Sequence, residues 1–214
     1  MVDLLISGPE GKIEAKYTHN NNNKSPIVLI LHPEPTLGGT MNTKIIFRLY
    51  KIFVNNGFSA IRFNFRGVGK SDGMHDDGEG ELSDATSVLD WLQQYNTNSK
   101  ICWVAGFSFG AWVSMQLLMR RPEINGFVSV SPPANLRDFS FLAPCPSSGL
   151  IIHGDRDNIA SFDSTKILAE KLQKQKKVDI KFKTIKGADH FYENYSDEFT
   201  SIVDNYIKDN LQSN

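Results

Sequence analysis

Residues 101–120 read ICWVAGFSFGAWVSMQLLMR and contain the pattern G-x-S-x-G at positions 106–110. The residues before Gly106 are mostly apolar, which is typical of a buried strand, and residues 111–120 have the pattern of a helix that ends before Pro122. A strand, a sharp turn and a helix in this order would expose the Ser108 hydroxyl at a helix N-terminus, where partial positive charge favours an oxyanion. A plain turn is the alternative interpretation. The flanking strand and helix favour a nucleophilic role for Ser108.

On both sides of this stretch, predicted strands and helices alternate. The pattern predicts an α/β fold with a mostly parallel, twisted sheet and helices on both of its faces. Two short stretches of alternating polarity near the N-terminus, residues 2–6 and 12–17, predict an antiparallel hairpin at the sheet edge. No linker or repeat interrupts the pattern, so we expect a single domain over residues 1–214. The predicted strands are 26–32, 59–65, 101–105, 126–130, 150–153 and 178–185, and the predicted helices are 40–56, 82–92, 111–120, 161–175 and 199–211.

Charge and cysteine content exclude several classes of protein. The 23 Lys and Arg residues nearly balance the 24 Asp and Glu residues, which leaves a net charge of −1. A nearly neutral chain is not steered to nucleic acid or to an anionic membrane surface. The two cysteines, Cys102 and Cys145, provide neither a disulfide framework nor zinc-ligand spacing. We therefore predict no metal, no cofactor and no nucleic-acid partner.

The N-terminal residues do not resemble a targeting segment. Asp3 stands where a signal peptide would carry positive charge, and the longest apolar run, residues 27–31, is far shorter than a membrane span. We expect a cytoplasmic protein without a membrane span. A homo-oligomer is compatible with the sequence.

A nucleophilic serine needs a base that accepts its proton, and the base needs a group that orients it. The chain has five histidines, of which His190 lies between the last predicted strand and the last predicted helix. His32 and His153 lie at strand ends, where a structural role is expected. His19 and His75 lie in polar loops, where we expect them to be solvated. His190 is therefore the predicted base.

The orienting acid is expected on the loop after residues 150–153. Asp155 and Asp157 both lie there. Asp157 is farther out on the loop and better placed to reach His190, whereas Asp155 is expected to cap the turn. Asp189 is adjacent to His190 in the sequence and would point elsewhere. We predict Asp157 as the acid, with Asp155 as the alternative.

The order Ser108, Asp157, His190, each after a predicted strand, resembles the α/β-hydrolase superfamily. Within it, the chain is similar to small lid-less bacterial serine hydrolases of the dienelactone-hydrolase-like and serine-aminopeptidase-like group. The resemblance runs from about residue 26 to the C-terminus, and it implies the α/β-hydrolase fold and a Ser-His-Asp triad. Dienelactone hydrolases proper have a cysteine where Ser108 stands, so their substrate is not implied. The supporting stretches are residues 32–39, 62–71, 106–110, 153–157 and 187–191.

An oxyanion hole in this fold takes one backbone N–H from the residue after the nucleophile, here Phe109. The second donor comes from the loop after the strand at residues 27–31. Many relatives have His-Gly there, whereas this chain has His-Pro-Glu-Pro at 32–35. Proline has no N–H, so Glu34 is the predicted second donor. Thr36 and Leu37 remain alternatives.

The substrate is the least determined part of the prediction. Residues 132–148 contain four prolines and no helical period, so no substantial lid is expected. An open site suits a small acyl ester or thioester, or an acyl or peptidyl group on a larger partner. No cationic cluster near the motifs indicates a carboxylate-binding pocket. The candidate pocket residues, of which two or three are expected to line the site, are Phe107, Phe139, Phe141, Phe191 and Tyr192.

Together these features predict a serine hydrolase that cleaves carboxylic ester or thioester bonds through an acyl-enzyme. A peptidase or aminopeptidase of the same fold is the first alternative. A non-catalytic binding protein that keeps the fold is the second.

Overall fold

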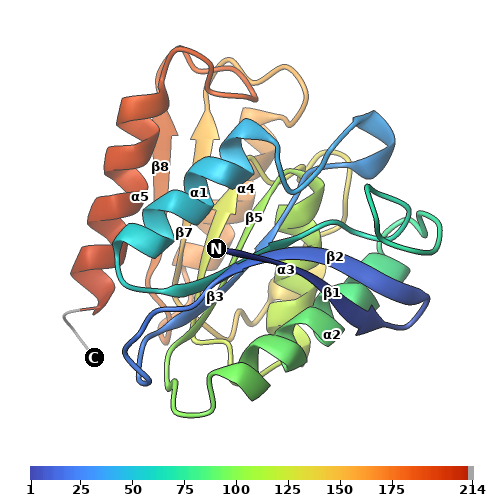
Figure 1. The fold of residues 1–214 in the computed structure, drawn as a ribbon. Coiled ribbons are helices and arrows are strands. Elements are labelled where there is room, and N and C mark those ends of the chain that lie inside the picture. Colours follow the sequence, from blue (N-terminus) through green and yellow to red (C-terminus); the bar gives the residue numbers. More distant parts are fainter. Residues whose placement is uncertain (212–214) are drawn as a thin grey trace.

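An eight-stranded sheet runs through the protein, whose computed structural model describes residues 1–211 (Figure 1). The strand order is β1-β2-β4-β3-β5-β6-β7-β8. β1 and β2 form an antiparallel hairpin at one edge, β2 pairs antiparallel with β4, and all other neighbours are parallel. The predicted fold class and the edge hairpin are confirmed. The strands are β1 (Val2–Gly8), β2 (Gly11–Thr18), β3 (Ile27–Leu31), β4 (Ser59–Phe63), β5 (Cys102–Phe107), β6 (Gly126–Val130), β7 (Gly149–Gly154) and β8 (Ile180–Ile185).

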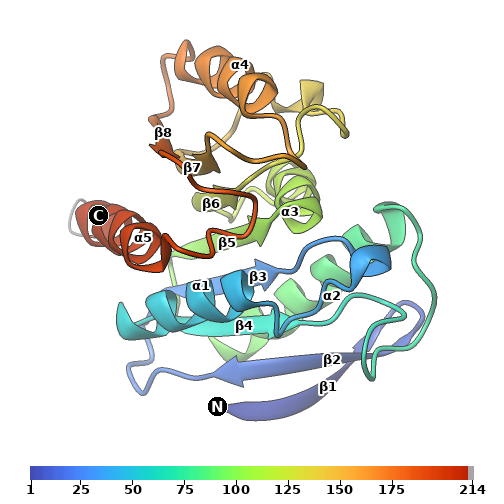
Figure 2. The ribbon, with the colours of Figure 1, turned by 90° about the horizontal axis from the view of Figure 1, so that it is seen from above.

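Helices cover both faces of the sheet. α1 (Lys44–Asn55) and α5 (Ser196–Leu211) lie on one face, and α2 (Glu79–Tyr95), α3 (Phe109–Arg120) and α4 (Phe162–Gln173) lie on the other (Figure 2). Every residue of β3 to β7 is buried, because strands covered on both faces have no solvent side. β8 is buried only at its two end residues, and its inner residues alternate between exposed and half-buried, as in an edge strand.

α1 shows how the sequence positions a helix beside the site. Ile45, Leu49 and Ile52 recur at helical spacing and are buried against the sheet. The same spacing leaves Lys44 and Arg48 on the outer face of the helix. The helix starts at Lys44 rather than at the predicted residue 40, because residues 40–43 form turns that precede it.

The carboxyl ends of the six parallel strands meet at one edge of the sheet, so the loops after β3, β5, β6, β7 and β8 gather there. The loop between β6 and β7 contains only one turn of 3-10 helix, Ser140–Leu142. The predicted absence of a lid therefore holds for the described chain. Among residues 1–211, no helix combines the length and the apolar composition needed to cross a bilayer.

His32 links two of these strand ends. Its ring is buried, Nε2 accepts a hydrogen bond from the Phe65 N–H at 3.0 Å, and Nδ1 donates to the Pro33 carbonyl at 2.7 Å. Burial disfavours the imidazolium and lowers the pKa of His32 to about 4, although the bond to Pro33 opposes that shift. The structural role predicted for His32 is confirmed.

The neutral state of His32 predicts a stability loss in mild acid. As the pH falls from about 6.5 to about 4, the unfolded chain takes up a proton at His32 that the folded chain does not. The contribution of neutral His32 to the free energy of unfolding is complete above pH 6.5, and about 3 kcal/mol of it is lost as the pH falls to about 4. Urea unfolding of the wild type and of His32→Gln across this range should show a shallower pH dependence in the variant. Parallel curves would contradict the assignment.

Candidate active site

Ser108 occupies a sharp turn between β5 and α3. Its backbone has φ 54° and ψ −119°, a region that a residue with a side chain adopts only under constraint. A Cβ on Gly106 would lie 2.3 Å from the Gly110 carbonyl oxygen, and a Cβ on Gly110 would lie 2.3 Å from the Leu31 carbonyl oxygen. The two glycines are therefore required for α3 to pack this closely against the ends of β5 and β3.

His190 and Asp157 are brought together by the loops after β8 and β7. His190 Nδ1 lies 2.7 Å from Asp157 Oδ2, and Asp157 Oδ1 accepts hydrogen bonds from the backbone N–H groups of Ile159 and Ala160, each at 2.9 Å. Burial favours the protonated carboxyl, but the bonds from His190 and the two N–H groups outweigh it and lower the pKa of Asp157. An ionised Asp157 accepts from Nδ1–H, which leaves Nε2 of His190 as the basic nitrogen.

Ser108 and His190 line one cleft, with a volume of about 130 Å³, at the carboxyl edge of the sheet. Both residues are almost fully buried within the protein. The remaining lining residues come mainly from the loop after β3 and from the loops that carry the acid and the base: Pro33, Glu34, Leu37, Gly38, Gly39, Thr43, Ile159 and Phe191. The structure thus places the predicted nucleophile and base in one space, with the predicted acid behind the base.

The competing aspartates have other partners. Asp155 Oδ1 accepts a hydrogen bond from the Gly187 N–H at 2.6 Å and so ties the loop after β7 to the loop after β8. Asp189 Oδ1 accepts from the Phe191 N–H at 3.2 Å. Neither carboxylate is hydrogen-bonded to the His190 ring in the described structure. The geometry therefore favours Asp157 over both alternatives.

His153 contributes a contact that the sequence analysis missed. Its Nε2 donates to the Ala160 carbonyl at 3.0 Å and lies 3.4 Å from Asp157 Oδ2. Burial lowers the pKa of His153, so the ring is neutral beneath the acid. Its position four residues before Asp157, at the end of a strand, is the only sequence signal for this contact.

The loop after β3 supplies the candidate oxyanion donors. The Thr36 N–H donates to Glu34 Oε1 at 3.4 Å, and the Leu37 N–H donates to the Glu34 carbonyl at 3.2 Å. Both alternative donors are therefore already hydrogen-bonded within the loop. No hydrogen bond among residues 1–211 uses the N–H of Glu34. Phe109 is the first residue of α3, where no helical carbonyl precedes its N–H. Of the four predicted donors, Phe109 and Glu34 are thus the two whose N–H has no hydrogen bond within residues 1–211.

The side chain of Glu34 is held by two basic residues. Its carboxylate lies 3.5 Å from Nε2 of His75 and 3.4 Å from a guanidinium nitrogen of Arg137. The opposite ring nitrogen of His75 lies 2.8 Å from the buried carboxylate of Glu81. The expectation that His75 is solvated is wrong, because the loop before α2 folds over the loop after β3 and leaves the His75 side chain 25% exposed.

Only Phe191 of the five predicted pocket residues lines this cleft. Phe107 is fully buried in the sheet, where its ring lies 4.8 Å from the His190 ring. Phe139 and Phe141 stack on each other and pack on the core beneath α2, α3 and α4 rather than in the cleft. Tyr192 is buried, with its hydroxyl 2.7 Å from Ser131 Oγ. Phe107 lies in a strand that is buried on both faces, and the connector that carries Phe139 and Phe141 packs on the core. Aromatic composition alone shows neither environment.

No group of three His, Cys, Asp or Glu side chains within residues 1–211 could hold a metal ion.

The substitution Tyr192→Phe tests which hydrogen bond stabilises the loop that carries His190. Tyr192→Phe keeps the ring but leaves the buried Ser131 hydroxyl without its 2.7 Å partner, which should lower the free energy of unfolding by about 1–2 kcal/mol. Tyr195→Phe is the control, because no hydrogen bond from its hydroxyl occurs in the described structure. Equal unfolding free energies for the two variants would show that the Tyr192 bond contributes nothing measurable.

Comparison with known proteins decides the family. The sequence profile of the X-Pro dipeptidyl-peptidase (S15) family matches residues 9–209. The chain belongs to this family, within the α/β-hydrolase superfamily. It is 48% identical to an uncharacterised protein of Rickettsia prowazekii across its whole length and 91% of that protein. It is also 26% identical to the bovine lysophosphatidylserine lipase ABHD12 over 69% of this chain, but only 42% of that lipase.

Two solved structures show the same architecture. A protein of unknown function from Agrobacterium tumefaciens, provisionally assigned as an α/β hydrolase, is 50% identical, with a TM-score of 0.97 over 99% of this chain and 97% of that one. An α/β serine hydrolase without a lid from Xanthomonas campestris is 27% identical, with a TM-score of 0.87 over 97% and 93%. The predicted resemblance to lid-less α/β hydrolases is confirmed.

Proposed function

We propose that this member of a serine hydrolase family cleaves carboxylic ester or thioester bonds through an acyl-enzyme on Ser108. The observation that carries the proposal is the shared cleft of Ser108 and His190, with Asp157 hydrogen-bonded to the far nitrogen of the base. Nucleophile, base and orienting acid in this relation are the parts that acyl transfer requires.

The proposed reaction uses these groups in two steps. Ser108 Oγ attacks the acyl carbon while His190 Nε2 takes its proton, and Asp157 stabilises the resulting imidazolium. His190 then protonates the leaving alcohol or thiol, and a water molecule activated by His190 hydrolyses the acyl-enzyme. The N–H groups of Phe109 and Glu34 hold the developing oxyanion, each worth on the order of 3 kcal/mol in the transition state.

The dimensions of the cleft support a small acyl group. Its volume of about 130 Å³ accommodates a short chain, and Leu37, Ile159 and Phe191 give its wall an apolar character. With no lid over the cleft, the rest of the substrate can extend into solvent. A free small ester or thioester fits this arrangement, as does an acyl group carried on a larger partner.

Ser108→Ala tests the nucleophile directly. A fluorophosphonate probe should label the wild type, and p-nitrophenyl acetate hydrolysis should fall at least about 10³-fold in the variant, with loss of labelling. Ser114→Ala is the matched control, because Ser114 is a buried serine of α3 whose hydroxyl bonds to the Ala111 carbonyl. A wild-type protein that neither reacts with the probe nor hydrolyses the ester would contradict the proposal and favour a non-catalytic binding protein.

A peptidase is the second candidate, favoured by the match to a dipeptidyl-peptidase family. Amide resonance makes the peptide bond harder to cleave, so a peptidase must hold its substrate on both sides of that bond. We expect kcat/KM for short p-nitrophenyl esters to exceed that for aminoacyl- and X-Pro-nitroanilides by at least about 100-fold. Efficient turnover of X-Pro-nitroanilides, with weak turnover of esters, would assign the peptidase activity instead.

A further inference from the structure

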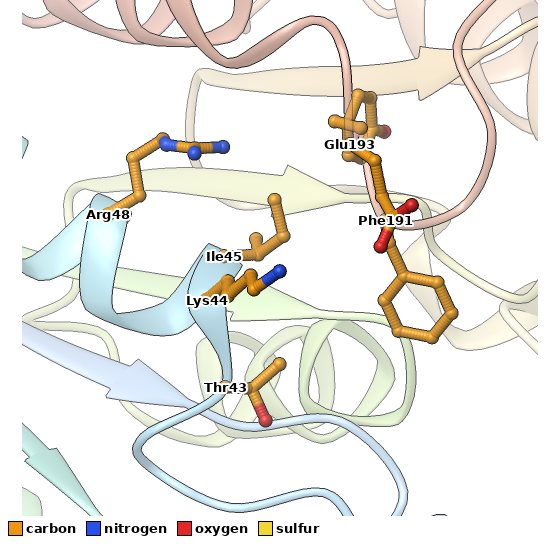
Figure 3. Close-up of a pocket in the computed structure, with 7 residues that line it drawn as sticks. Thr43, Lys44, Ile45, Arg48, Phe191 and Glu193 are labelled. Atoms are coloured by element: carbon orange, nitrogen blue, oxygen red, sulfur yellow. The ribbon is translucent and has the colours of Figure 1, made fainter.

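A second cavity, of about 570 Å³, adjoins the catalytic cleft and is not used by the chemistry described above. It lies between the first turns of α1 and the segment that follows His190 (Figure 3). Thr43 and Phe191 line both this cavity and the cleft that holds Ser108. The two spaces are therefore neighbours, and a substrate bound at Ser108 can extend into the larger one. Its lining residues are Thr43, Lys44, Ile45, Arg48, Phe191, Tyr192 and Glu193.

Two cations form one wall of this cavity. Lys44 and Arg48 are one helical turn apart, and Figure 3 shows both side chains extending from α1 towards the segment with Phe191 and Glu193. Neither cation has a carboxylate within 4.0 Å in the described structure, whereas Arg66, Arg121 and Arg137 each have two. The cations are thus available to a ligand.

The start of α1 adds to the positive potential. Thr43 precedes the helix, but its side chain makes no capping bond to the first turn and instead accepts from the Thr40 N–H at 3.2 Å. The first-turn N–H groups therefore contribute partial positive charge next to Lys44. Glu193 stands on the opposite wall without an ion pair to either cation, so the lining has a net charge of +1.

Apolar surface connects the cations to the nucleophile. Ile45 contributes to the floor of the cavity, and the Phe191 ring, 46% exposed, forms the boundary with the cleft. A ligand that spans this route would place a reactive ester at Ser108, a short apolar segment against Phe191 and a negative group at Lys44 and Arg48.

We propose that this cavity is a substrate subsite for an anionic group, a carboxylate or a phosphate, attached by a short apolar segment to the ester or thioester cleaved at Ser108. The inference rests on the proposed hydrolase function and specifies its substrate class. Lys44 and Arg48 are the specificity-determining residues, because they contact the anion and not the reacting atoms.

Matched ester pairs test the subsite through activity. The carboxylate arm compares p-nitrophenyl hemiglutarate with p-nitrophenyl valerate, and the phosphate arm compares butyrylglycerol phosphate with butyrylglycerol. The wild type should prefer the anionic ester of at least one pair, by about twentyfold in kcat/KM, and the arm that shows the preference identifies the anion. Lys44→Gln and Arg48→Gln should each lower this ratio about fivefold, and the double variant should abolish it.

Lys51→Gln is the matched control, because Lys51 is an exposed lysine on the same helix that lies over the Phe47 ring and does not line the cavity. It should leave the ratio of anionic to neutral ester hydrolysis unchanged. A wild type that hydrolyses neutral esters without preferring either anionic one would overturn the subsite while leaving the proposed function intact.

Binding to the Ser108→Ala variant gives a readout that does not depend on activity. Phenyl phosphate and 4-phenylbutyrate should shift the amide resonances of Thr43 and Ile45, and 4-phenylbutanol should do so at least about tenfold more weakly. Added salt should weaken the binding of the anions, since exposed charges are screened. If the anions and the alcohol bind with equal affinity, the subsite is overturned even if no ester is hydrolysed. The same holds if Lys44→Gln and Arg48→Gln leave the affinity for the anions unchanged.

Discussion

The close packing of α3 against the ends of β3 and β5 is the constraint on which the carboxyl edge of this protein depends. Gly106 and Gly110 have no room for a Cβ, since an added atom would meet backbone carbonyl oxygens at 2.3 Å. Ser108 lies at the turn into this tightly packed helix, and its φ is positive, at 54°. The other loops at this edge complete the candidate site around Ser108.

Most of the architecture follows from hydrophobic patterning. Strands covered on both faces are mostly apolar, as β3 is throughout, and helices such as α1 repeat apolar residues at helical spacing, so the sequence distinguishes the two. The candidate triad can also be predicted from the sequence, because Ser108, Asp157 and His190 each follow a strand whose end lies at the same edge. The environment of each side chain is harder to predict from the sequence. Phe107 reads as a pocket residue, but its position in a fully covered strand buries it completely.

Contacts between distant segments are where sequence reasoning stops. Lys44 and Arg48 have the spacing of any solvated helix face, and nothing in their local pattern indicates that the segment after His190 packs opposite them. His75 likewise lies in a polar loop, yet it faces carboxylates from two other segments. Arg137 reaches Glu34 from the short connector after β6, and its guanidinium lies over the rings of Phe109 and Trp112. That connector thus braces the loop after β3.

The uncovered cleft also has a consequence for the fate of an acyl group on Ser108. Enzymes that close over a covalent intermediate keep water away from it and can pass the group to another acceptor. In the proposed reaction, the short connector between β6 and β7 places no lid over an acyl group on Ser108, so water can enter the cleft. For the proposed acyl-enzyme, the absence of a lid over the cleft would favour release of a free acid over transfer to another acceptor.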